Sequence, residues 1–87
     1  MSDETLLEFP CQFSIKAFGL GDQDFPYIVH SIVGTFVEGL SREAVRSRPS
    51  RKGKYLAVTV TFTASSKHQL DNIYQALTAH ERVVMAL

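Results

Sequence analysis

The chain has 87 residues, of which 45% are hydrophobic and 21% are charged, and its formal net charge is zero. This length allows one domain with a single two-layer core, and the composition excludes an intrinsically disordered protein. The balanced charge creates no overall field that would attract nucleic acid or a membrane surface. Cys11 is the only cysteine, which excludes an internal disulfide and a cysteine-based metal site.

The amino terminus is acidic and lacks the basic and apolar regions of a signal peptide. No apolar run approaches the ~20 residues that a membrane-spanning helix needs. We therefore expect a soluble cytoplasmic protein with no membrane contact.

Residues 1–10 are expected to form a short arm that ends at Pro10. Gln12–Phe18 then alternate between apolar and polar side chains, and a period of two predicts a strand. One face of this strand carries its core residues, which are Phe13, Ile15 and Ala17.

A loop with two glycines, Gly19–Asp24, follows this strand. Asp24 precedes Phe25 and Pro26, where an aspartate side chain caps a helix and a proline is tolerated in the first turn. The expected helix carries apolar residues at spacings of three and four, namely Phe25, Ile28, Val29, Ile32, Val33, Phe36 and Val37. We expect this helix to end at Gly39, which permits a left-handed turn.

Glu43–Arg48 form a weak second strand in which Arg46 and Arg48 point the same way. Charged side chains and the following Pro49, which has no backbone donor, are typical of an edge strand. A tight hairpin at Gly53 leads into the next strand, over residues 54–63. That strand has strict alternation, and its core face consists of Leu56, Val58, Val60 and Phe62.

Ser66 is followed three residues later by Gln69, which is the pattern of a capping box and predicts the start of a second helix. The buried face of that helix is expected to hold Leu70, Ile73, Tyr74 and Leu77. His80, near its carboxyl end, is a favourable charge at a helix terminus. The last strand is expected over Arg82–Leu87, which is apolar nearly throughout.

The predicted order is strand, helix, strand, strand, helix, strand. Right-handed crossovers place both helices on one face of a four-stranded antiparallel sheet. The fold class is therefore α+β, a ferredoxin-like βαββαβ two-layer sandwich that occupies residues 1–87 as one domain.

Five segments carry a resemblance to a known family, and they lie in the same order along nearly the whole chain. They are residues 6–10, 13–19, 50–55, 73–77 and 82–87. These segments resemble the YbeD-like family of small bacterial proteins. The resemblance implies a fold similar to the ACT-type regulatory domain of phosphoglycerate dehydrogenase, a domain type that commonly pairs and binds small metabolites. The family has no established biochemical activity, so no catalytic residue is carried over.

The first candidate site is the loop after the first strand. The resemblance implies that this turn contacts a ligand, and its candidate residues are Phe18, Gly19, Gly21, Asp22 and Asp24. The two aspartates oppose a phosphate and favour a ligand with an amino group. The structural alternative is a capped helix start that follows a flexible turn.

The second candidate site is basic. Six of the nine basic residues lie between positions 42 and 54. The candidate surface for a partner or a polyanion consists of Arg46, Arg48, Arg51, Lys52, Lys54 and Tyr55. An RNA recognition motif needs alternating exposed aromatic side chains, whereas Tyr55 is followed on its face by Ala57, Thr59 and Thr61. The structural alternative is a solvated edge that resists unwanted pairing.

Catalysis has little support, because no nucleophile lies beside a base in this pattern. His30, His68 and His80 lack metal-site spacing, and the loop lacks the arginine that an acylphosphatase needs. We expect no cofactor and no metal. The leading hypothesis is a non-enzymatic regulatory or adaptor domain that binds a small metabolite or a protein partner, as a homodimer or with another protein. The alternative is an RNA or polyanion docking module that uses the basic hairpin over residues 46–54.

Overall fold

The computed structural model describes residues 7–50 and 52–87. Its elements are β1 (Cys11–Leu20), α1 (Phe25–Gly34), the short 3-10 helix η2 (Arg42–Ala44), β2 (Val45–Pro49), β3 (Tyr55–Ala64), α2 (Lys67–Ala79) and β4 (Met85–Ala86). The first six residues of the predicted arm and Arg51 of the predicted basic surface lie outside the described residues.

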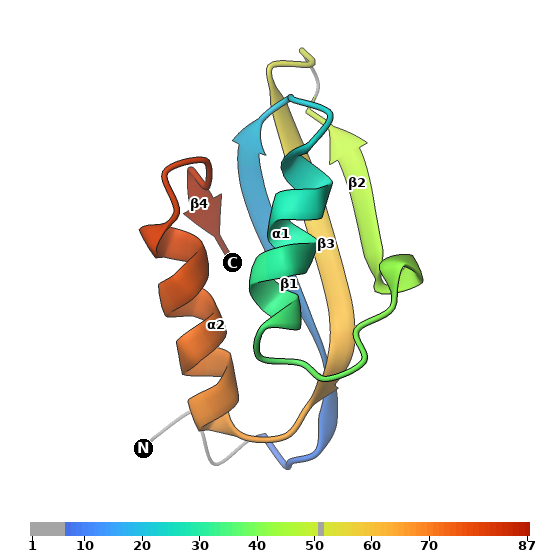
Figure 1. Cartoon of the computed structure of the whole chain (residues 1–87), viewed down its shortest axis with the longest axis vertical. Coiled ribbons are helices and arrows are strands. Elements are labelled where there is room, and N and C mark those ends of the chain that lie inside the picture. Colours follow the sequence, from blue (N-terminus) through green and yellow to red (C-terminus); the bar gives the residue numbers. More distant parts are fainter. Residues whose placement is uncertain (1–6, 51) are drawn as a thin grey trace.

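The four strands form one antiparallel sheet in the order β2-β3-β1-β4, and α1 and α2 cover one of its faces (Figure 1). This arrangement confirms the predicted ferredoxin-like α+β class. It also confirms the edge position of β2, which among the described strands pairs only with β3. Within residues 7–50 and 52–87, no helix lies against the opposite face of the sheet, and we call it the open face.

The core lies between the sheet and the helices. Ile15 pairs with Val60 and Ala17 pairs with Val58, and all four side chains are fully buried. Phe25, Val29 and Val33 of α1 and Leu70, Ile73 and Leu77 of α2 close the core from the other side. The alternation in β1 and β3 therefore predicted the correct face for each residue, and it leaves their intervening side chains on the open face.

Two boundaries around the first helix differ from the prediction. β1 continues through Gly19 and Leu20, which pair with Leu56 and Tyr55, so it takes in the start of the predicted loop. α1 ends at Gly34 and not at Gly39. The amide groups of Thr35 and Phe36 bond to carbonyl groups three residues back, which tightens the last turn. Gly39 does have a positive φ of 71°, but in the following loop.

The predicted cap of α2 is confirmed in part. The Ser66 hydroxyl accepts a hydrogen bond from the Gln69 amide at 3.0 Å. The Gln69 side chain reaches back to the Ser65 amide at 2.7 Å, one residue before the position that a capping box requires. Its amide nitrogen donates to the Phe36 carbonyl at 2.8 Å, so Gln69 also joins α2 to the loop after α1.

The predicted second and last strands both prove shorter. Residues 42–44 form η2, where the Ser41 hydroxyl accepts from the Glu43 amide, and β2 begins only at Val45. β4 comprises only Met85 and Ala86, although the neighbouring Val84 and Leu87 also bond to β1. Arg82 precedes the strand because the chain turns there, with the Val83 amide bonded to the His80 carbonyl.

Candidate functional site

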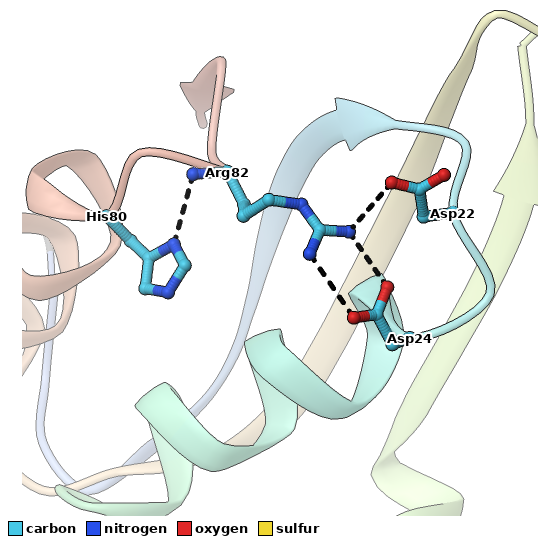
Figure 2. A network of polar contacts seen from close by, with 4 residues as sticks. All are labelled: Asp22, Asp24, His80 and Arg82. Atoms are coloured by element: carbon cyan, nitrogen blue, oxygen red, sulfur yellow. Dashed lines mark hydrogen bonds and ion pairs between the residues drawn. The ribbon is translucent and has the colours of Figure 1, made fainter.

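The carboxylates of the predicted ligand loop converge on a residue from the other end of the chain. The Arg82 guanidinium lies 2.9 and 3.2 Å from the two carboxylate oxygens of Asp24 and 3.2 Å from an oxygen of Asp22 (Figure 2). Asp24 stands at the amino-terminal cap position of α1, but its side chain makes no capping hydrogen bond. The predicted capping role of the Asp24 side chain is therefore wrong, because Arg82 takes its two oxygens.

The electrostatics of this cluster follow from the hydrogen bonds. The bond from Arg82 is the largest influence that lowers the pKa of Asp24, and the same bond to Asp24 raises the pKa of Arg82. One guanidinium thus serves two carboxylates, which are otherwise largely exposed. An amine ligand at this loop would compete with Arg82 for both aspartates.

Gly19, another residue of that candidate set, is closely packed. A Cβ atom there would lie 2.5 Å from the Phe25 ring and 2.6 Å from the Arg82 carbonyl oxygen. Gly19 therefore allows β1, the start of α1 and the turn before β4 to meet. The ligand role of residues 18–24 stays a prediction. Their contacts show that they join the end of β1, the start of α1 and the turn before β4.

His80 positions the backbone of this turn. Its Nδ1 accepts a hydrogen bond from the Arg82 amide at 3.1 Å (Figure 2). An accepting Nδ1 carries no proton, so this contact is made by the neutral ring. The predicted role of His80 as a positive charge at the end of α2 does not match this geometry.

The basic residues of the second candidate site divide into two groups. Arg46 and Arg48 project from β2, and they line a cavity of about 460 Å³ on the open face together with Lys16 of β1. The strand register explains this grouping, since Arg46 and Lys16 both pair with Thr59 of β3. Lys54 belongs to the hairpin, where its ammonium group lies 5.5 Å from the centre of the Tyr55 ring.

Lys16, Arg46 and Arg48 form what we call the cationic row. Within residues 7–50 and 52–87, none of these three cations has a carboxylate within ion-pair distance. The small side chains of Ala57 and Thr59 lie between them and form the floor of the cavity. The row therefore surrounds the hollow with positive side chains that take part in no salt bridge among the described residues.

An apolar margin borders the cationic row on the open face. Met85 of β4 pairs with Phe18, and Leu87 exchanges backbone hydrogen bonds with Lys16. Paired residues of neighbouring strands place their side chains on the same face. Leu20, Met85 and Leu87 are exposed by 51%, 47% and 61%, which is unusual for three large apolar residues close together.

Sequence reasoning found Arg46 and Arg48 but missed Lys16, Met85 and Leu87 as parts of this surface. The alternation of β1 did place Lys16 opposite the core. The pattern within one strand does not indicate which residues of other strands lie beside that strand, however. The cationic row could therefore be identified only from the pairing of β1 and β2 with β3.

Other kinds of site have less support in the part of the chain that the structure describes. It contains no cluster of three histidine, cysteine or carboxylate side chains that would hold a metal ion. Nor does it contain a helix with the length and apolar character needed to cross a membrane.

Comparison with known proteins gives a consistent result. Residues 4–87 match the family described as "Protein of unknown function (DUF493)". The chain is 44% identical to the UPF0250 protein NE1487 of Nitrosomonas europaea over 87 residues, which is the full length of both chains. It is 43% identical to a UPF0250 protein of Chromobacterium violaceum over 89 residues, again the full length of both.

A solved structure supports the fold. The solution structure of protein HP0495 from H. pylori superimposes with a TM-score of 0.74, over 93% of this chain and 85% of that one. The sequence identity is 16%, so this likeness concerns the fold alone. Together, the family match and the curated relatives confirm the resemblance to the YbeD-like proteins.

Proposed function

Since the chain belongs to the DUF493 family, described as proteins of unknown function, we propose its role from the geometry of its surface. The domain is a non-enzymatic adaptor that binds an acidic segment of a protein partner on the open face of its sheet. The observation that carries this proposal is the cationic row of Lys16, Arg46 and Arg48 around a hollow of about 460 Å³.

The row favours an anionic partner for an electrostatic reason. Arg46 and Lys16 flank the same residue, Thr59, and Arg48 lies two residues further along β2. Like charges on one face of a sheet repel one another, and no salt bridge among the described residues involves any of these three cations. A partner carboxylate would relieve that repulsion and accept hydrogen bonds from the guanidinium groups.

The apolar margin favours a protein over RNA. Leu20, Met85 and Leu87 offer exposed aliphatic surface beside the charges, which matches a peptide that carries both acidic and apolar side chains. Single-stranded RNA needs aromatic faces on which bases stack, and the middle of the open face instead carries Ala57, Thr59 and Thr61. The zero net charge of the chain also favours a protein partner over RNA, because it creates no overall field that attracts a polyanion.

A metabolite at residues 18–24 receives less support than a partner on the open face. Both aspartates of that loop already bond to Arg82, and the Phe25 ring fills the space beside Gly19. The cations of the open face are more accessible to a partner, because none of them takes part in a salt bridge among the described residues.

The test uses a fluorescein-labelled decapeptide of alternating glutamate and leucine, with a glutamine–leucine peptide and an oligouridine of ten nucleotides beside it. The protein variants are the triple substitution Lys16→Gln, Arg46→Gln, Arg48→Gln and the control Lys52→Gln. We expect the acidic peptide to bind the native chain, and the triple variant to weaken that binding at least about tenfold. The control variant is expected to retain the binding.

Three outcomes would overturn the proposal. The first is equal binding of the glutamine–leucine peptide, and the second is unchanged binding by the triple variant. The third is tighter binding of oligouridine with a steep dependence on salt, which would support polyanion docking in place of a protein partner.

A further inference from the structure

A second cavity lies on the helix side of the molecule, between the first turns of α1, the short helix η2 and the start of β2. Its volume is about 350 Å³, and its walls are formed by Pro26, Tyr27, His30, Arg42 and Val45. Pockets that hold small organic ligands begin at roughly this size, about 300 Å³.

This cavity and the cationic row lie on opposite faces of β2. Val45 pairs with the buried Val60, so its side chain points toward the helices. Arg46 is the next residue and therefore points to the open face. The two sites share no residue, and a substitution at one leaves the walls of the other in place.

The walls combine a flat apolar surface with two polar groups. Tyr27 is 67% exposed, although its neighbours Phe25 and Val29 are fully buried. Pro26 and His30 lie four residues apart on α1 and therefore share one side of that helix. With Val45, these rings make walls suited to a planar ligand.

His30 is held in one orientation. Its Nε2 lies 3.0 Å from the Leu40 carbonyl oxygen, and a carbonyl only accepts, so Nε2 is the nitrogen that carries the proton. In the neutral ring this leaves Nδ1 as an acceptor. The bond also ties α1 to the segment that leads into η2.

Arg42 supplies the charge. It opens η2, whose first turn is held by the bond from the Glu43 amide to the Ser41 hydroxyl at 3.0 Å. Among the described residues its guanidinium has no hydrogen bond and no carboxylate partner. A guanidinium of this kind presents a planar pair of donors that fits a carboxylate.

We propose that this cavity binds a small aromatic carboxylic acid. The ligand carboxylate pairs with Arg42, its ring packs against Tyr27, Pro26 and Val45, and a ring hydroxyl donates to Nδ1 of His30. An uncharged ring lacks the ion pair, and a charged molecule without a ring lacks the packing, so both features are required for binding.

The experiment is an amide NMR titration of the full chain with 4-hydroxybenzoate, compared with 4-hydroxybenzamide and with acetate. We expect shifts confined to residues 27–30 and 42–45 with 4-hydroxybenzoate, and at least about tenfold weaker binding in Arg42→Gln. Arg42→Lys should keep part of the affinity, because it retains the charge without the planar pair of donors. Arg48→Gln on the open face is the matched control and should bind like the native chain.

The proposal is overturned by equal shifts with the benzamide, by shifts that cluster elsewhere, or by undiminished binding in Arg42→Gln. A native-like spectrum of free Arg42→Gln verifies its fold, and η2 is exposed enough for the substitution to be tolerated. Failure of the acidic peptide to bind the open face would leave this result unchanged, since the two tests use different residues.

Discussion

The guanidinium of Arg82 donates hydrogen bonds to both carboxylate oxygens of Asp24, which lies 58 residues earlier in the chain. The contact ties the turn that follows α2 to the start of α1 (Figure 2). It thereby connects the crossover that contains α1 to the crossover that contains α2.

The first prediction concerns the pH dependence of this contact. The bond from Arg82 lowers the pKa of Asp24 below its ordinary value of 3.8. In the acid range the unfolded chain therefore binds more protons at this site than the folded chain does, and stability rises with pH. The contact therefore contributes fully to the free energy of unfolding at pH values above the ordinary pKa of Asp24, and this contribution is lost as the pH falls through the lowered pKa.

Urea unfolding at about pH 6 and about pH 3 measures this effect. Asp24→Asn should be less stable than the native chain at the higher pH and should lose less stability on acidification. Asp71→Asn, which removes an exposed pair with Lys67, is the control and should keep a native-like pH dependence. Equal losses in Asp24→Asn and the native chain would refute the linkage.

The second prediction concerns the amino-terminal end of α2. Ser66→Ala removes the acceptor for the Gln69 amide and should cost about 1 kcal/mol. Gln69→Ala removes the bonds to Ser65 and Phe36 together and should cost about 1–2 kcal/mol. Gln69→Glu separates the two bonds, because it retains the acceptor for Ser65 but has no donor for the Phe36 carbonyl.

Chemical denaturation of the three variants provides the measurement. Gln69→Glu should be destabilised relative to the native chain, with the loss reported by amide exchange in residues 35–38. Native stability in Gln69→Glu would mean that the bond to Phe36 contributes nothing to the connection between the helices.

The third prediction compares two glycines. Gly19→Ala would place a Cβ atom 2.5 Å from the Phe25 ring and should destabilise the fold by about 1–3 kcal/mol. Gly34→Ala, at the end of α1, places the new Cβ more than 4 Å from every described residue outside its own turns of helix and should stabilise the fold by about 0.5–1 kcal/mol. Thermal melting distinguishes them, and a tolerated Gly19→Ala would contradict the close packing around β1.

The sequence predicted best what depends on local periodicity. The faces of β1 and β3 follow from alternation, and the buried faces of α1 and α2 follow from spacings of three and four. The end of α1 was less predictable, because the loop that contains Phe36 is held by Gln69 from α2. The hydrogen bonds of Arg82 to Asp24 and the meeting of Lys16 with Arg46 depend on strand order, which no local pattern contains.

The last prediction tests the register that places the cationic row. Val60 is fully buried, so Val60→Asp puts an unpaired charge in the core and should cost about 4 kcal/mol or more. Thr59→Asp faces the other way, and its carboxylate would stand between Lys16 and Arg46, its partners on the two neighbouring strands.

The Thr59 variant should therefore stay folded, because opposite charges on adjacent strands attract one another. It should also lose affinity for the acidic peptide, since the new carboxylate occupies the cations that the peptide needs. Melting temperatures and peptide titrations of both variants check this pair of expectations. Similar melting temperatures would mean that the register of β3 is displaced by one residue. A stable Thr59→Asp that still binds the peptide normally would move the partner surface away from the cationic row.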